Sequence, residues 1–475
     1  MTTHRLRGAC PALAALALLG GCASVPENAG LAAVNERVAP ATGQTLIQRR
    51  DAESDAAARA EVARLLARPL SADDVVRVAL LNNFELQSAL ADLGIARAEL
   101  MQASLVPNPV FHGEWKWEHG EGRPLVDIGL MQPIQGLLTL PARKRAASAS
   151  FDLRKIEVAD AVFGLVRETR VAVVELQAEK ARCALLEEVA GSASASLDVA
   201  RRLHAAGNLT DRDLDRRQAM EAEARLALAE SEEAVAMRVE ALNQVMGVFG
   251  DDTRWRLADD LTEPERSPPD TAGIERAAIE ASLSLAAARA RLETAAERVG
   301  IENTQSLFRH LELGPVHEHK GGEREYGFGL GFELPLFDVG QGQRAAAQAM
   351  FIKRSAEYRA TALAVRSAAR SAALRLSAAD DKARYTREVL APLAQRQFAG
   401  KVLEYNAMQI GVFRLLSAFD AQTAMKRRLI DATRDYWLAL IDIGALHAGH
   451  TPASGTMTAG STAAMPMAGG SDGGH

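Results

Sequence analysis

The sequence predicts a mainly α-helical fold with a small β part, built as a duplication. Long stretches without proline are rich in Ala, Leu, Arg and Glu, which are good helix formers. Two stretches, 108–134 and 310–337, alternate apolar with polar residues at the period of a β-strand. The helical pattern also recurs about 200 residues further along the chain. We therefore expect two copies of one unit: a helix, a β-hairpin and a long α-helical hairpin.

The N-terminus resembles a bacterial lipoprotein signal. Arg5 and Arg7 precede an apolar run over 9–19 that is too short to span a bilayer permanently. The run ends in Leu-Gly-Gly-Cys, which is similar to the lipobox whose cysteine receives lipid. We expect removal of 1–21 as a signal peptide and lipidation of Cys22. An ordinary signal peptide that happens to contain a cysteine is the alternative.

Both β-hairpin regions have one aromatic face. In the first hairpin the aromatic residues alternate with polar or charged ones, and in the second they alternate mostly with glycine. The aromatic residues are Phe111, Trp115, Trp117, Tyr326, Phe328 and Phe332. This pattern is typical of membrane-spanning β-barrel strands, so we expect these six side chains to face lipid. A soluble hairpin packed on a core is the alternative.

The proline-free stretches are long enough for extended helical hairpins. From Pro141 to Gly207 the sequence is compatible with one helix of roughly 60 residues, about 90 Å in length. Gly207 and Asn208 mark a turn, and Thr210 or Asp211 is suited to cap the next helix. Apolar residues along that next helix have the spacing of a coiled coil.

The duplication has an offset of 201 residues. The coiled-coil positions Leu228, Val235, Val239 and Leu242 recur as Leu429, Tyr436, Leu440 and Ile443. We divide the mature chain into an N-terminal extended segment, a first repeat, a linker, a second repeat and a disordered tail. The ranges are 22–70, 71–258, 259–273, 274–446 and 447–475. The linker is rich in proline and acidic residues.

Four strands per chain are too few for a membrane barrel. The smallest membrane barrels have about eight strands. An open sheet edge in lipid would leave backbone groups without hydrogen bonds. If the hairpins lie in a membrane, several chains must share one barrel, and three chains would supply twelve strands.

Four segments, taken in order, resemble the TolC-like family of outer-membrane efflux proteins. They are VALLNNFELQSALADLGIARAELMQASLVPNPVF at 78–111, AAGNLTDRDLD at 205–215, GFELPLFDVGQGQ at 331–343 and YNAMQIGVFRLLSA at 405–418. The resemblance covers nearly all of the mature chain except the tail. It implies a homotrimer with a shared twelve-stranded β-barrel in outer-membrane lipid. It also implies a coiled-coil helical tunnel through the periplasm, where 22–70 would form part of an equatorial region. A periplasmic adaptor and an inner-membrane pump are the implied partners.

The resemblance also places a gate at the two helical tips, where the periplasmic entrance would lie. The gate candidates are Asp211, Asp213, Ile410, Arg414 and Ser417. The family often has Tyr-x-x-Gly at the second tip and acidic residues beyond it, whereas this chain has Met408, Arg414 and Ser417. Arg414 could pair with Asp213 of a neighbouring tip, and a solvated charge is the alternative.

The C-terminal tail combines thioether and imidazole side chains, which suit soft metal ions such as Cu(I). The candidate transient ligands are His447, His450, Met457, Met465, Met467 and His475. A disordered tail with incidental methionines is the alternative. The favoured function is export of heavy metal, copper in particular. Export of organic toxicants is the alternative within this class, and a lipidated periplasmic adaptor or coiled-coil scaffold is the rival from another class.

Several function classes are disfavoured by the sequence. The net charge of −6 supplies no basic excess to meet nucleic-acid phosphates. No phosphate-binding loop, nucleophile elbow or metalloprotease motif appears, so we expect neither an enzyme nor a cofactor. Once Cys10 leaves with the signal and Cys22 carries lipid, Cys183 has no partner for a disulfide.

Overall fold

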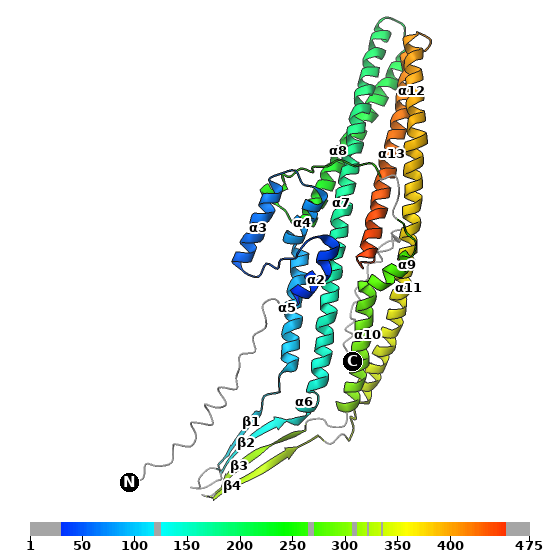
Figure 1. The fold of residues 1–475 in the computed structure, drawn as a ribbon. Coiled ribbons are helices and arrows are strands. Elements are labelled where there is room, and N and C mark those ends of the chain that lie inside the picture. Colours follow the sequence, from blue (N-terminus) through cyan, green and yellow to red (C-terminus); the bar gives the residue numbers. More distant parts are fainter. Residues whose placement is uncertain are drawn as a thin grey trace, which may run out of the picture.

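The computed structural model describes residues 30–117, 125–264, 270–305, 311–320, 323–333 and 336–452. Figure 1 shows an elongated molecule with a small sheet at one end and two helical tips at the other. The fold is mainly helical with a four-stranded antiparallel sheet, which confirms the expected fold class. Among the described residues, no helix is both long enough and apolar enough to cross a membrane.

The first repeat runs from a helix pair through a hairpin to a long helical hairpin. Its elements are α4 (Ala72–Asn82), α5 (Phe84–Ser104), β1 (Val110–Lys116), β2 (Leu125–Pro133), α6 (Ile134–Leu138), α7 (Leu140–Ala205) and α8 (Asp211–Met246). Helix α7 has 66 residues, in agreement with the long proline-free stretch. A short 3-10 helix, η1 (Gly250–Thr253), follows.

The second repeat follows the same plan. Its elements are α9 (Ile274–Ala281), α10 (Leu283–Gln305), β3 (Glu312–Lys320), β4 (Glu323–Gly331), α11 (Gln341–Tyr385), η2 (Thr386–Leu390), α12 (Ala391–Asn406) and α13 (Val412–His447). Helices α8 and α13 have 36 residues each and their bounds differ by the expected 201. The start of α11 and the end of α12 likewise lie 201 residues after the start and the end of α7. The duplication is therefore present in the fold.

One proline makes the two long helical arms different. Pro392 stands near the start of α12, and the preceding turn, η2, is π-helical. The proline ring clashes with the carbonyl four residues earlier, and a wider turn relieves that clash. The equivalent stretch of α7 is an uninterrupted α-helix.

The N-terminal segment is more helical than expected. The prediction of an extended segment over 22–70 is wrong for α2 (Leu31–Thr42) and α3 (Ala52–Leu66). A capping box begins α3, in which the Asp51 carboxylate accepts a hydrogen bond from the Ser54 amide at 2.7 Å. Helix α2 lies beside α7 and buries Val34 and Val38 in the same core.

The sheet has the order β1-β2-β3-β4, so β1 and β4 are its edges. All pairs are antiparallel, and the register places one residue of each strand in a common row. Because side chains alternate across a strand, successive rows face opposite sides of the sheet. One face therefore contains Phe111, Trp115, Tyr326 and Phe328, and the other face contains the residues between them.

The two repeats meet along α7 and α13, and ion pairs accompany this contact. Arg167 Nε donates to Asp442 Oδ1 at 2.7 Å, and Arg182 Nε donates to Asp431 at 2.9 Å. Three apolar clusters accompany these ion pairs: two involve α4 and α7, and one lies between α9, α11 and α13. Leu283 of α10 belongs to one of the first two, so that cluster also joins the repeats. The contact between the repeats is thus polar as well as apolar.

The tail begins later in the chain than expected. Helix α13 continues through His447, and the His450 Nδ1 lies 2.9 Å from Asp160 Oδ1 on α7. Pro452 is buried. The prediction of disorder from residue 447 is therefore wrong for 447–452, because the Asp160 partner of His450 is 290 residues away in the chain and no local pattern indicates it.

The two helical tips have the same hydrogen-bonded turn but different residues in it. In the first tip the Asn208 amide donates to the Leu203 carbonyl, with Gly207 at φ 76°. The second tip repeats this bond, and Met408 takes the glycine position at φ 61°. Such a left-handed backbone costs a residue with a Cβ roughly 1–2 kcal/mol. Met408 is the only non-glycine residue with positive φ in the described chain.

We expect Met408→Gly to stabilise the second tip by about 1 kcal/mol, because glycine adopts left-handed backbone without strain. Amide hydrogen exchange over 407–411 measures this local stability. Gly207→Ala is the matched control and should speed exchange in the first tip. Equal exchange at the second tip with methionine and with glycine would rule out strain at this position.

Candidate functional site

The aromatic face of the sheet brings the six sequence-predicted residues together. Phe111 and Trp115 of β1 share this face with Tyr326 and Phe328 of β4, with two strands between them. Trp117 and Phe332 continue the alternation just beyond the strand ends. All six are exposed, and Phe328 retains 83% of its accessible surface. An exposed aromatic face of this size is a surface for contact with an apolar environment.

The opposite face of the sheet contains a row of four carboxylates. Glu114 pairs with Asp127, Asp127 with Glu318, and Glu318 with Glu325, so one acidic residue comes from each strand. Like charges directly across strands are destabilising. Lys116 offsets part of this charge, with its Nζ 3.0 Å from Glu114. Oδ1 of Asp127 is buried without a hydrogen-bond partner among the described residues.

The sequence alone indicated a charged face but missed this row. Alternation identified Glu114 as opposite to Trp115, but the cross-strand register cannot be read from separate strands. On the same face the neighbouring row toward the helices contains His112, Gly129, Val316 and Gly327. The carboxylate row therefore carries four acidic side chains, whereas the neighbouring row carries none.

The predicted gate residues lie at the two tips, as expected from their position in the helical hairpins. Asp211 forms an ion pair with His204, with 2.6 Å between Oδ1 and Nε2. Asp213 accepts a hydrogen bond from the Thr210 hydroxyl at 2.8 Å. Within the described chain neither carboxylate is bonded to Arg414. Arg414 and Ser417 are exposed, and Ile410 is half-buried.

A different contact joins the two tips. The Arg217 guanidinium of α8 lies over the Phe413 ring of α13, 4.0 Å from its centroid. A cation over an aromatic face is attracted by about 0.5–1 kcal/mol at an exposed site. Sequence reasoning missed this pair because Arg217 and Phe413 belong to different repeats. Their positions at the starts of equivalent helices are the only signal for it.

Next to this contact lies a cavity of about 290 Å³ between α7, α8 and α13. Ser196, Arg217 and Asp420 are among the residues that line it. Burial raises the pKa of the Asp420 carboxyl, and the nearby Arg217 opposes this shift. The Arg217 side chain thus faces two possible partners on α13, Phe413 and Asp420.

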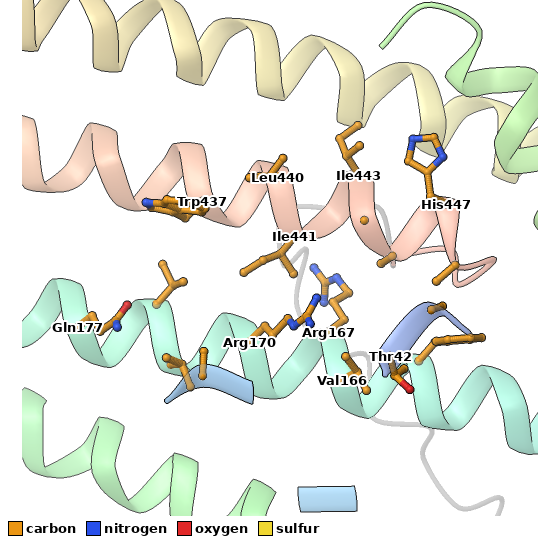
Figure 2. Close-up of a pocket in the computed structure, with 18 of the residues that line it drawn as sticks. Thr42, Val166, Arg167, Arg170, Gln177, Trp437, Leu440, Ile441, Ile443 and His447 are labelled. Atoms are coloured by element: carbon orange, nitrogen blue, oxygen red, sulfur yellow. The ribbon is translucent and has the colours of Figure 1, made fainter. Parts of the chain in front are cut away.

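A larger groove of about 660 Å³ lies between α7 and α13 (Figure 2). Its walls are mostly apolar, with Val166 on α7 and Trp437 and Ile441 on α13. The linker covers part of it: Trp437 Nε1 donates to the Thr262 carbonyl at 2.9 Å. Arg167 in this groove is held by Asp442. The groove is therefore part of the joint between the repeats and the linker.

The proposed metal ligands of the tail are only partly described. Met457, Met465, Met467 and His475 lie outside the described residues, as does the lipidation candidate Cys22. His450 packs over Gly164 and faces Asp160, so this residue has a structural contact. In the described part of the chain, no group of three or more His, Cys, Asp or Glu side chains is arranged to hold a metal ion.

No known protein-family model matches the sequence. The chain is 25% identical over 371 residues to the cobalt-zinc-cadmium resistance protein CzcC of Cupriavidus metallidurans, covering 76% of this chain and 85% of that protein. It also resembles the crystal structure of a membrane protein from Pseudomonas aeruginosa, with a TM-score of 0.65, 19% identity, and coverage of 82% and 93% of the two chains.

A second similar structure is the CmeC outer-membrane channel of Campylobacter jejuni. Its TM-score is 0.64 at 16% identity, with 80% of this chain and 86% of that chain covered. The chain therefore has the fold of the TolC-like outer-membrane efflux proteins, and the family resemblance in its sequence is confirmed.

Proposed function

We propose that three copies of this chain form an outer-membrane efflux channel that exports metal cations, anchored by lipid on Cys22. The row of four carboxylates is the observation that supports a cationic cargo. In a barrel of three chains it becomes a ring of twelve carboxylates around the lumen. Rings of Asp and Glu side chains favour cations in channels.

The free edges of the sheet support assembly from several chains. Strands β1 and β4 each have one side without a partner strand in the described chain. With the aromatic face in lipid, those backbone groups need partners from another copy. Pairing β4 of one chain with β1 of the next closes the sheet, and the carboxylate face becomes the lumen. A lipidated adaptor or scaffold, the rival interpretation, does not explain this sheet.

The helices offer a second assembly surface. Four apolar residues of α11 are exposed and stand eleven residues apart: Ile352, Leu363, Leu374 and Tyr385. Leu226 and Met237 on α8 are exposed with the same spacing. Eleven residues are close to three helical turns, so each set forms one straight stripe. Helix α8 of one chain can therefore pack against α11 of its neighbour, and the three chains then form a tunnel.

The cargo proposal rests on charge and on the named relative. CzcC is called a cobalt-zinc-cadmium resistance protein, and metal ions such as these are the cargo that we propose here. Copper, which the sequence favoured, rests on the tail thioethers. An adaptor and an inner-membrane pump would deliver the cargo at the tips, because an exposed Arg414 from each chain would repel free cations there.

We expect Asp127→Asn to lower the cation preference of the channel. The substitution removes three of the twelve charges, and the cation-over-anion permeability ratio should fall about twofold at low salt. The reversal potential across a planar bilayer with a salt gradient measures the ratio. Asp127→Glu keeps the charge and should retain the wild-type ratio. An unchanged ratio in Asp127→Asn would exclude the carboxylate row as the selective element.

We also expect Arg217→Gln to raise the open probability of the isolated channel, because it removes about 0.5–1 kcal/mol of attraction between the two tips in each chain. Single-channel recording measures this, and Arg216→Gln on the same helix is the matched control. Arg414→Ala tests the sequence-derived gate candidate in the same recordings. If only Arg414→Ala has an effect, the Arg217–Phe413 contact does not hold the entrance closed.

A further inference from the structure

The outer end of the aromatic face differs from the rest of that face. Moving from the helices toward the hairpin turns, Phe111, Leu130 and Phe328 give way to rows that contain His317, His319 and Arg324. Among the residues of the four strands that share this face, these three are the only ones able to carry a charge. None of these facing residues is acidic. This end of the face therefore carries basic side chains and no acidic ones.

We propose that this rim, defined as Trp115, His317, His319, Arg324 and Tyr326, binds the phosphate group of a glycolipid in the outer leaflet of the outer membrane. The inference rests on the proposed function, because it needs the aromatic face in lipid and the hairpin turns on the exterior. It adds a lipid-binding site to the outside of the channel.

The register brings the rim residues into contact range. Trp115, Val126, His319 and Arg324 form one row across the four strands, and His317 and Tyr326 belong to the next row on the same face. Neighbouring strands lie about 4.8 Å apart, so His319 and Arg324 are directly adjacent. One phosphate group can therefore contact both side chains.

The two histidines are prepared for this role in different ways. The His317 ring stacks on Tyr326 with 4.6 Å between centroids, and its Nδ1 donates to the Glu325 carbonyl at 3.0 Å. Because a carbonyl only accepts, Nδ1 holds the hydrogen and the ring is fixed in orientation. Nδ1 of His319 is buried and has no hydrogen-bond partner within the described residues. A phosphate oxygen can accept a hydrogen bond from a ring N–H of His319.

The surroundings favour a lipid phosphate over other anions. Arg binds phosphate through paired N–H groups, and it does so more strongly where water is scarce. Trp and Tyr side chains gather at membrane–water interfaces, so Trp115, Trp117 and Tyr326 set the depth of the rim at the headgroup level. The acidic residues of β3 and β4 at this end, Glu318, Glu323 and Glu325, lie on the other face and do not oppose an anion here.

The test uses the full-length protein in detergent and two probes, diphosphorylated lipid A and the same lipid with its phosphates removed. Native mass spectrometry measures binding of each. We expect wild type to prefer the phosphorylated form, and the double variant Arg324→Gln, His319→Gln to bind it about tenfold more weakly. Lys116→Gln is the matched control, since Lys116 lies at the same end but on the opposite face. It should bind as wild type does.

The site would be overturned if wild type bound the two probes equally. It would also be overturned if the double variant bound the phosphorylated probe as tightly as wild type does. Conductance and subunit number of the same samples separate this inference from the proposed function. A conducting trimer without phosphate preference overturns the lipid site alone. A monomer without conductance would remove the proposed function and, with it, the reason to place the rim in a membrane.

Discussion

Unpaired backbone groups at the two edges of the sheet determine how copies of this chain would have to be arranged in a membrane. One chain has only four strands, and both β1 and β4 end the sheet. In water such edges are tolerable, but in lipid each unpaired N–H and C=O costs several kcal/mol. The aromatic face argues for lipid, with Phe328 almost wholly exposed. In the proposed assembly neighbouring chains pair with these edges, and the carboxylate row faces the enclosed lumen.

The helical part of the proposed trimer also needs contacts between copies, which its exposed apolar residues can make. Its exposed stripes on α8 and α11 are apolar, so they suit permanent contact between copies. The contact of α7 with α13 inside one chain includes ion pairs such as Arg182–Asp431. Ion pairs in contact with solvent contribute little and exchange readily. In the proposed trimer, permanent apolar contacts between chains and exchangeable polar contacts within a chain would allow the tips to move while the ring stays closed. The strained Met408 and the Arg217–Phe413 contact lie where that motion would be largest.

Periodicity in the sequence was sufficient to predict the strands and the duplicated long helices. Alternation around Trp115 predicted the strand, and the 201-residue offset between Leu242 and Ile443 predicted the duplicated helices. Helices α2 and α3 escaped prediction because their apolar stripes are short and their stability comes from packing on the rest of the chain, as Val38 shows. The carboxylate row and the Arg217–Phe413 contact could not be predicted, since each depends on register between segments far apart in sequence. The Asp160 partner of His450 was hidden for the same reason.

The number of chains in the membrane particle distinguishes a shared barrel from a single-chain protein. Native mass spectrometry of the full-length protein, extracted from outer membranes in mild detergent, measures that number without assumptions about cargo. The account predicts three chains, because three sets of four strands close a barrel of twelve. A stable particle that contains a single chain would contradict it, since the edges of β1 and β4 would then be exposed to lipid without partners.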